Sequence, residues 1–275
     1  LDAPSVQHRL KVIIDSKNLV LENVYNQEPL SYDEIMEWCR SQAEFFKDYI
    51  CDVGTLLGAA AGQGKNILFE AQLGALRDID YGIYPFTSSS NTIASYAPIG
   101  AGIPGCALDN VVGVMKAYST CVGEGPFVAE TAMGEAWNEK LRESGGEFGA
   151  ATGRPRRVGP FDAVASRYGI RCQKAQDIAL TKLDVLGAFD KIPVITGYRL
   201  HGVLLDSFPT DSRLEEAEPV IEELPGWECD ISGCRSWKDL PENARKYVCT
   251  LEKLVDHPIY LVSTGAERDA YLLRE

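Results

Sequence analysis

The fold class is decided by residues 161–184, which read FDAVASRYGIRCQKAQDIALTKLD. Phe161 to Lys174 has the apolar spacing of a helix, and Ile178 to Leu183 is a short apolar run of strand length. Further along, 193–205 has a strand pattern and 242–255 a helical one. Strands that alternate with helices in this way predict an α/β fold with a largely parallel central sheet flanked by helices.

The N-terminal part, 1–65, is expected to be a helical segment. Ser5 to Val20 carries apolar residues at helical spacing, and Ser31 has the position of an N-cap for a second helix. Apolar residues at steps of three or four continue from there to Val53, so this second helix is expected to be long and amphipathic. Asn66 to Glu70 then reads as a short buried strand.

The composition restricts the classes of function. The 275 residues are 45% hydrophobic, enough for a sizeable core, and 27 Lys and Arg against 40 Asp and Glu give a net charge of −13. Such a charge argues against binding to a nucleic-acid backbone or an anionic membrane, although a local basic cluster can still hold a small anion. No apolar run reaches the ~18 residues typical of a membrane span.

The eight cysteines are scattered, and no stretch has the pattern of a signal peptide. Cys229 and Cys234 are the closest pair, but the three histidines do not supply the remaining ligands of a zinc site with the required spacing. We therefore expect a reduced, cytoplasmic protein with no metal at this pair.

Two glycine-rich strings resemble nucleotide-binding motifs without fulfilling them. Gly100 to Gly105 fits G-x-G-x-x-G, but its lead-in contains a proline, and Pro104 lacks the backbone N–H that the motif needs. Gly58 to Lys65 resembles a phosphate-binding loop, but Asn66 stands where Ser or Thr should hold Mg²⁺. We interpret the first string as a flexible loop and the second as a helix end with a glycine cap.

Residues 149–157, GAATGRPRR, form the strongest local signal. Arg154, Arg156 and Arg157 crowd together in a strongly acidic chain, and the neighbouring glycines let the backbone approach a ligand. Guanidinium groups bind carboxylates and phosphates in a two-pronged manner, which favours an anion pocket. A solvated basic turn, or arginines that pair with surface carboxylates, fits the composition equally well.

A second candidate site follows the predicted strand at 178–183. The Asp184 carboxylate can accept from guanine N1–H and the 2-amino group, while the stem of Lys182 covers the ring face. Ser263 to Gly265, at the end of the strand predicted over 259–263, are placed to line the same pocket, because parallel strands bind ligands at their carboxyl ends. The alternative is a surface lysine followed by an aspartate that caps a helix.

A third candidate is the Gly-, Pro- and Ser-rich loop from Asp78 to Asn91, which has no clean period. Irregular loops of this length are often functional, and the polar side chains from Ser88 to Asn91 suit phosphate oxygens. The alternative is an ordered surface loop held by its own Ser and Asn hydrogen bonds.

Taken together and in order, these strings resemble adenylosuccinate synthetase. The match spans Asn66 to Arg274, whereas 1–65 resembles the family only in its helical pattern. The matching strings are LFE at 68–70, DIDYGIYPF at 78–86, SSSN at 88–91, KAYST at 116–120, VGEGPF at 122–127, EFG through TGRPRR at 147–157, GPFD at 159–162, TKLDVL at 181–186, PGW at 225–227 and VSTG at 262–265. The resemblance implies that 66–275 is the C-terminal part of a nucleotide- and substrate-binding α/β domain, with a P-loop-NTPase-like synthetase fold lacking its first strands.

That family is a ligase of AMP biosynthesis that joins IMP and L-aspartate into adenylosuccinate, with GTP as co-substrate and Mg²⁺ as cofactor. GTP phosphorylates the hypoxanthine oxygen, and the amine of aspartate then displaces that phosphate. The resemblance implies an IMP site that contains Ser88, Arg154, Gln72 and Leu73. It implies an aspartate loop formed by Ala150, Ala151, Thr152, Gly153, Arg154, Pro155 and Arg156. It implies contacts with GTP from Arg156, Lys182, Leu183, Asp184, Ser263, Thr264 and Gly265.

Three positions depart from the family pattern. Residues 69–74 read FEAQLG where the family usually has FEGAQG, so the IMP-contacting Gln aligns with Leu73, and Gln72 replaces it only after a local shift. Ala151 stands for the first Thr of Thr-Thr-Gly-Arg and removes a hydroxyl from the aspartate loop. Ser88 in place of the common Thr is a mild change.

The family's phosphate loop, catalytic Asp, catalytic His and the Arg that one subunit lends to its partner all lie N-terminal to the strings matched here. The resemblance therefore implies a C-terminal portion of a homodimeric enzyme, with no catalytic residue and no Mg²⁺ ligand of its own, and inactive when isolated. A nucleotide-binding protein without the ligase activity, or a paralogue with an altered purine substrate, is the alternative. Sequence preceding Leu1 would separate these hypotheses.

Overall fold

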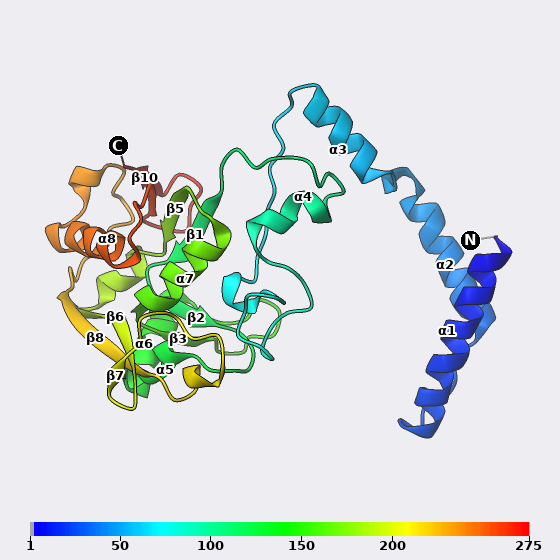
Figure 1. Ribbon diagram of the computed structural model, residues 1–275, viewed down its shortest axis with the longest axis horizontal. Helices are drawn as coiled ribbons and strands as arrows, with labels where there is room; N and C mark the ends of the chain where they lie inside the picture. Colours follow the sequence, from blue (N-terminus) through cyan, green and yellow to red (C-terminus); the bar gives the residue numbers. More distant parts are fainter. Residues whose placement is uncertain (1–2, 275) are drawn as a thin grey trace. The chain divides into compact units, whose positions relative to one another are not determined.

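The chain forms two compact units. The computed structural model describes residues 3–274, and the units comprise Leu1–Asn66 and Ile67–Glu275. The first unit is helical (Figure 1), and its α-helices are α1 (Pro4–Asn23), α2 (Tyr32–Phe46) and α3 (Val53–Gly62). No helix among the described residues is both long and apolar enough to span a membrane.

The long second helix expected from the sequence is interrupted. Ser31 caps α2, as expected, but α2 ends at Phe46 and the 3-10 helix η1 (Lys47–Tyr49) follows it. Asp52 then caps α3 by accepting from Thr55 N at 3.0 Å. The apolar period therefore extends over two helices. The chain starts a new helix at the Asp52 cap and does not continue α2.

The second unit is built on a four-stranded sheet in the order β1-β5-β9-β10. β1, β5 and β9 are parallel, and β10 pairs antiparallel with β9. The bounds are β1 Val112–Lys116, β5 Asp177–Thr181, β9 Leu261–Ser263 and β10 Tyr271–Leu273. The strands expected over 178–183 and 259–263 are therefore present, and the α/β class is confirmed.

The other sheets of this unit are mixed or antiparallel. β6 is central to the second four-stranded sheet, pairing parallel with β4 and antiparallel with β7 and β8, while β2 and β3 form a separate antiparallel pair. The bounds are β2 Ser119–Cys121, β3 Arg157–Gly159, β4 Phe161–Asp162, β6 Lys191–Leu200, β7 Val203–Leu204 and β8 Glu218–Pro225. The parallel arrangement thus holds for β1-β5-β9 and for β4-β6.

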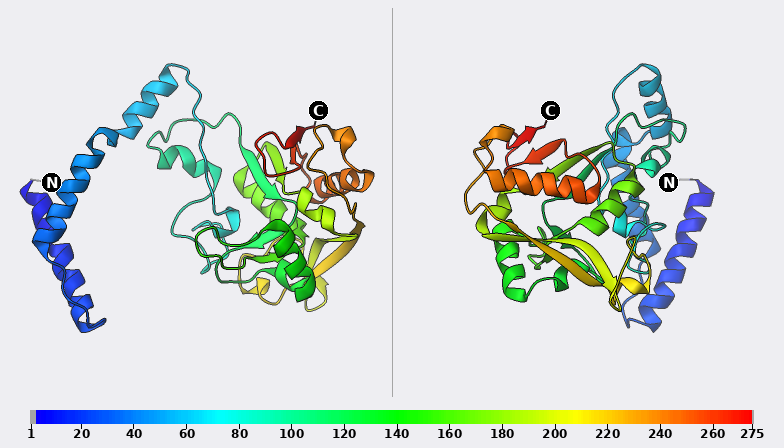
Figure 2. Two further views of the ribbon diagram at one scale, coloured as in Figure 1. Left: turned by 180° about the vertical axis from the view of Figure 1, so that it is seen from behind. Right: turned by 60° about the vertical axis from the view of Figure 1, so that its left-hand side comes forward.

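Helices pack against these sheets. The longer ones are α6 (Glu135–Gly145), α7 (Ala163–Gln173) and α8 (Glu242–Val255). The short ones are α4 (Ala97–Gly100), α5 (Val128–Thr131), η2 (Ala75–Arg77), η3 (Ala94–Tyr96), η4 (Asp184–Ala188), η5 (Ser212–Leu214) and η6 (Trp237–Asp239). In Figure 2, α8 (orange) runs between the C-terminal strands (red) and β8 (yellow). Tyr247 of α8 donates to the carbonyl oxygen of Ala117 at 2.6 Å, which fixes the helix to the end of β1.

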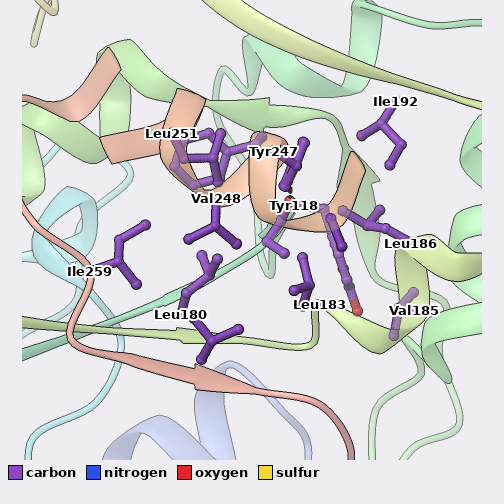
Figure 3. Packing of buried hydrophobic residues seen from close by; sticks show 14 of the residues in the cluster. Tyr118, Leu180, Leu183, Val185, Leu186, Ile192, Tyr247, Val248, Leu251 and Ile259 are labelled. Carbon is purple, nitrogen blue, oxygen red and sulfur yellow. Dashed lines mark hydrogen bonds between the residues drawn. The ribbon is translucent and has the colours of Figure 1, made fainter. Parts of the chain in front are cut away.

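One hydrophobic core joins the central sheet to α8 (Figure 3). Leu180 of β5 and Leu251 of α8 are fully buried in it. Tyr118 and Leu183, which follow closely after β1 and β5, are buried in the same core. The ends of both strands are therefore held by apolar packing, and the polar residues beside them start from fixed backbone positions.

The glycine-rich string at 58–65 has the structure expected of it, and the string at 100–105 is a loop after its first residue. α3 ends at Gly62, and Gly64 follows in a left-handed conformation with φ +71°. Gly100 ends the short helix α4, and no strand leads into it. The strand expected over 66–70 was a wrong prediction, because no strand among residues 3–274 pairs with this segment and Leu68 is 94% exposed.

Candidate functional site

Polar side chains gather where β1 and β5 end. The two strands are parallel neighbours with Lys116 paired in register with Thr181, so their carboxyl ends lie at one edge of the sheet. Lys116 is the last residue of β1, and Lys182 follows the last residue of β5. β9 pairs parallel with β5 and ends at Ser263 on the same edge. This is the edge at which open parallel sheets bind ligands.

Glu147 is the centre of this group, and its side chain has no exposed surface. Its Oε1 accepts hydrogen bonds from Lys116 Nζ at 2.8 Å and Tyr118 Oη at 2.6 Å, and Lys182 Nζ lies 3.4 Å from the same oxygen. Its Oε2 accepts from Arg156 Nη1 at 2.8 Å. One buried carboxylate thus binds side chains from the ends of two strands and from the basic loop.

The charges of this cluster are set by burial and by hydrogen bonding. Burial opposes ionisation of Glu147, but hydrogen bonds from Lys116, Tyr118 and Arg156 outweigh it and hold its pKa at about 2. Burial lowers the pKa of Lys116, and the ion pair with Glu147 partly offsets this. Burial and the hydrogen bond to Glu147 raise the pKa of the Tyr118 hydroxyl. One anion therefore faces three cations, and the excess positive charge suits an anionic ligand.

The basic loop is closed by its own backbone. Phe148 and Pro155 form an isolated antiparallel bridge, and Arg156 N donates to Glu147 O at 2.9 Å. Inside the loop, Gly149 N donates to Arg154 O at 2.8 Å, and Gly153 N donates to Gly149 O at 2.7 Å. Gly153 has φ +65°, a conformation that glycine adopts without strain. Residues 148–155 are therefore a constrained loop whose base is formed by Glu147 and Arg156.

The three arginines of this loop have three different environments. Arg157 binds Glu130 through Nε at 2.8 Å and Nη2 at 2.6 Å, and its Nη1 donates to two glycine carbonyls. Arg156 binds the buried Glu147. Arg154 is exposed, and its guanidinium forms no hydrogen bond or ion pair with any residue in 3–274. The paired-arginine interpretation holds for Arg157, whereas Arg154 retains all its donors for a ligand.

Lys182 and Asp184 lie immediately after β5. Lys182 has φ +60°, and its Nζ donates to Gly145 O at 2.6 Å. Asp184 opens η4, is half-buried and has its pKa raised by burial. No side chain among the described residues hydrogen-bonds its carboxylate, and η4 has no side-chain cap. The backbone N–H groups of Asp184 and Val185 oppose the effect of burial on the pKa of this carboxylate, and the N-cap position of η4 is occupied by Leu183.

The other residues of the predicted GTP site are held mainly by backbone contacts. Ser263 Oγ donates to Gly265 O at 2.9 Å, and the buried Thr264 donates to Cys234 O at 3.2 Å. Leu183 is completely buried in the core, so only its backbone can face a ligand. These contacts give the edge beside Asp184 a defined shape.

The loop from Asp78 to Asn91 is ordered by a buried carboxylate. Asp78 accepts from Asp80 N, Tyr81 N and Thr92 N, and these bonds lower its pKa against the opposing effect of burial. Ser88 Oγ lies 3.1 Å from Ser90 Oγ. The loop thus has the internal bonds of an ordered surface loop, and its Ser88 hydroxyl remains half-buried beside exposed serines.

Arg77 joins this loop to the neighbourhood of Arg157. Its Nη1 donates to Phe86 O and to Glu124 O at 2.9 Å, and its Nη2 donates to Val122 O at 3.1 Å. Arg157 binds the next part of the same segment, donating to Gly123 O at 3.2 Å and Gly125 O at 2.8 Å. Residues 122–125 therefore accept hydrogen bonds from two arginines: Arg77, directly before the loop of 78–91, and Arg157 of the basic string.

A separate cavity of about 230 Å³ borders the altered motif at 69–74. Gln72 and Leu73 both line it, together with Ser90, Asn91 and Tyr96. Leu73 has φ +77° and is 58% exposed, so a residue with a β-carbon occupies a conformation that usually requires glycine. The structure therefore places Gln72 and Leu73 beside the Ser88–Asn91 segment.

Sequence patterns did not single out the central group, Glu147, Lys116 and Tyr118, nor Arg77. Their partners lie 9 to 47 residues away, so no local period marks them. For Glu147, Lys116 and Tyr118, the signal in the sequence was their presence inside strings that match a family, whereas Arg77 lies outside those strings. Among residues 3–274, no group of three or more His, Cys, Asp or Glu side chains is arranged to hold a metal ion, and no Mg²⁺ ligand is assigned to this part of the chain.

Comparisons with known proteins give one consistent result. A family model described as adenylosuccinate synthetase matches residues 1–272. The adenylosuccinate synthetase of Trichlorobacter lovleyi is 46% identical over 274 residues, which are 99% of this chain and 63% of that protein. The one from Pelobacter propionicus is 45% identical over 266 residues, 96% of this chain and 61% of that protein.

The fold is similar to a solved structure of the same description. The fully ligated adenylosuccinate synthetase of Plasmodium falciparum matches with a TM-score of 0.89 and 33% sequence identity, over 98% of this chain and 63% of that one. The chain therefore spans about three fifths of the length of the relatives that it matches.

Proposed function

The chain belongs to the adenylosuccinate synthetase family, and on that basis we propose that the full-length protein containing it joins IMP and L-aspartate to form adenylosuccinate, using GTP. One observation carries the proposal beyond the family match. The predicted aspartate loop and the predicted guanine-binding lysine meet on the buried carboxylate of Glu147. This shared contact supports the proposal that residues from both predicted substrate sites belong to one connected group.

We assign the guanine end of GTP to Asp184 and Lys182. The Asp184 carboxylate is half-buried without a side-chain donor among residues 3–274, so it is available to the N1–H and 2-amino donors of guanine. Lys182 is held by Gly145 O, and its stem can cover the ring face. Ser263, Thr264 and Gly265 border the same edge of the sheet.

We assign the anionic parts of the substrates to the basic loop and the serine loop. Arg154 has a guanidinium without a partner among the described residues and sits on a constrained loop, which suits a carboxylate of aspartate. Arg156 stands at the base of that loop beside Lys182, toward GTP. We assign Ser88 to the phosphate of IMP, and this assignment is supported by the cavity that Gln72 and Leu73 line together with Ser90, to which Ser88 is hydrogen-bonded.

The reaction has two steps that balance. The 6-oxygen of IMP attacks the γ-phosphorus of GTP, a phosphorus–oxygen bond forms as the bond to the β,γ-bridging oxygen breaks, GDP leaves, and hypoxanthine loses its N1 proton. The aspartate ammonium group loses one proton, and the resulting amine attacks C6. A carbon–nitrogen bond forms, the bond between C6 and its oxygen breaks, and the amine nitrogen loses a second proton, while the departing phosphate takes up one proton, so the two steps together release two protons. In this scheme, residues 3–274 bind and orient the substrates.

A second candidate is favoured by one specific observation. Leu73, not an amide side chain, occupies the expected IMP-contact position in a left-handed conformation, while Gln72 lines the same cavity. A purine monophosphate with a different base substituent would then replace IMP. By analogy with its relatives, we also expect the full-length protein to be a cytoplasmic homodimer.

A single assay tests the proposal. The full-length protein is incubated with IMP, L-aspartate, Mg²⁺ and either GTP or ATP, and product is identified by mass. Adenylosuccinate formed with GTP and not with ATP supports the proposed function. Product from another purine monophosphate, with IMP inert, selects the second candidate, and binding of GTP without any ligation rejects both.

A further inference from the structure

The geometry points to Glu147 as a positioning residue that couples the aspartate loop to the guanine-binding edge, so that GTP and aspartate strengthen each other's binding. This inference rests on the proposed function, because it concerns the same two substrate sites. Glu147 itself is fully buried and contacts no solvent, so it acts through the groups that it holds.

The first side of the coupling is the base of the basic loop. Arg156 is bound to Glu147 twice, through the guanidinium at 2.8 Å and through its backbone N–H, which donates to Glu147 O at 2.9 Å. The bridge between Phe148 and Pro155 continues the same pairing into the loop. The orientation of the segment that carries Arg154 is therefore fixed directly at Glu147.

The second side is the edge that reads guanine. Lys182 Nζ is held between Gly145 O at 2.6 Å and Glu147 Oε1 at 3.4 Å. Lys116, which shares Oε1 at 2.8 Å, ends the strand that pairs with β5. Displacement of the carboxylate would therefore move both lysines at the carboxyl ends of β1 and β5.

The site requires a carboxylate, not merely a polar side chain. Oε1 already faces Lys116, Tyr118 and Lys182, and Oε2 faces Arg156. The amide of a glutamine in place of Glu147 would keep one acceptor oxygen. Its NH₂ group, which is a donor, would face the cationic donors that now bind the second carboxylate oxygen. Lys116, Lys182 and Arg156 would also lose the one counter-charge that they share within residues 3–274, so the aspartate loop and the guanine-binding edge would no longer be held together.

A shared rigid group is what reciprocal coupling between two sites needs. GTP that contacts Lys182 favours one position of the Glu147 carboxylate, and that position favours one orientation of Arg156 and its loop. Aspartate bound to the loop acts in the reverse direction with the same factor, because binding free energies are linked.

The test uses the full-length protein and its Glu147→Gln variant. The KM for GTP is measured at low and at saturating aspartate, and the KM for aspartate at low and at saturating GTP. In the wild type, each substrate should lower the KM for the other, on the order of fivefold. In Glu147→Gln, both KM values should rise on the order of tenfold and neither should respond to the other substrate.

Three further variants separate positioning from general damage. Glu130→Gln removes the carboxylate of the neighbouring ion pair with Arg157 and should leave the mutual effect of the substrates intact. Glu147→Asp keeps the negative charge and should therefore retain part of the mutual effect of the two substrates. Lys116→Met removes one hydrogen bond to Glu147 and changes no residue that we assign to a substrate. If Glu147→Gln does not fold, the KM values of Lys116→Met test the coupling instead.

The outcomes are distinguishable. Failure of the wild type to form adenylosuccinate rejects the proposed function. An active wild type whose Glu147→Gln variant keeps both KM values and their mutual effect rejects this inference alone. The inference is also overturned if Glu147→Gln raises only one of the two KM values, or if Glu130→Gln loses the mutual effect of the substrates as well. If Glu147→Gln does not fold, a Lys116→Met variant with unchanged kinetics overturns it.

Discussion

Arg156 and Arg157 are neighbours in the sequence, but their guanidinium groups bind carboxylates on different sides of the chain: Arg156 binds the buried Glu147, and Arg157 binds the half-exposed Glu130. Successive side chains of an extended segment point in opposite directions, and Arg157 is the first residue of β3. The basic string therefore divides into one arginine that belongs to the candidate site and one that holds the loop to the fold.

Arg154→Leu and Arg157→Leu should fail in different ways. Loss of the exposed guanidinium of Arg154, which we assign to a carboxylate of aspartate, should lower kcat/KM by roughly 30- to 5,000-fold, or about 2–5 kcal/mol, with little change in stability. Arg157→Leu should instead lower the free energy of unfolding by about 1–3 kcal/mol, because Glu130 and two carbonyls lose their donor. Steady-state kinetics and urea unfolding of both variants check this, and equal small effects on activity would make the cluster a basic surface turn.

Asp184→Asn should change the base specificity. The amide that replaces one carboxylate oxygen faces a donor of guanine, and the mismatch should cost about 1–3 kcal/mol in GTP binding. Xanthine has a carbonyl where guanine has its amine, so use of XTP should rise. Steady-state kinetics with GTP and with XTP measure this change of preference. An unchanged KM for GTP would mean that the guanine pocket lies elsewhere.

Glu147 should make the protein sensitive to acid only below about pH 4.5. Its pKa is about 2 in the folded protein against an ordinary 4.5, so its ionised form contributes stability above pH 4.5 that is lost as the pH falls toward 2. Between pH 6 and pH 3 that loss is about 2 kcal/mol. Urea unfolding should therefore show that the free energy of unfolding falls less on acidification in Glu147→Gln than in the wild type, by about this amount. If the free energies of unfolding of the two proteins change with pH in parallel, the assigned pKa is wrong.

Gly145→Ala should disturb the cluster by steric overlap. A β-carbon at Gly145 would lie 2.5 Å from Tyr118 Oη and 3.2 Å from Glu147 Cγ, and the tyrosine is buried. The expected loss of stability is about 1–3 kcal/mol. Gly233→Ala is the matched control, since no atom lies within 4 Å of its β-carbon. A thermal melt in which both variants behave like the wild type would contradict the described packing.

Much of the fold could be predicted because its signals are local. The apolar period over 242–255 coincides with α8, and the strand pattern over 193–205 covers most of β6 and all of β7. The segment 66–70 was mispredicted because an apolar run alone cannot show whether a partner strand is nearby. The interrupted second helix shows the same limit, because Asp52 is a short local signal inside a longer period.

The candidate site was predictable at its ligand-facing residues and not at its centre. Arg154 and Asp184 follow recognisable strings, a basic Gly-rich loop and a strand end. Glu147 lies in no such string, because its role depends on partners that are distant in the sequence. These partners are Lys116 at the end of β1, Tyr118 after β1, Lys182 after β5 and Arg156 of the basic loop. Only the topology that places β1 beside β5 brings these side chains together.

The stoichiometry of the full-length protein's reaction tests the central claim most directly. GDP, inorganic phosphate and adenylosuccinate are quantified together after incubation of the protein with GTP, IMP and L-aspartate. All three should form in equal amounts, and omission of IMP or aspartate should prevent formation of adenylosuccinate. GTP hydrolysis without adenylosuccinate, or adenylosuccinate formed without consumption of GTP, would contradict the proposed function.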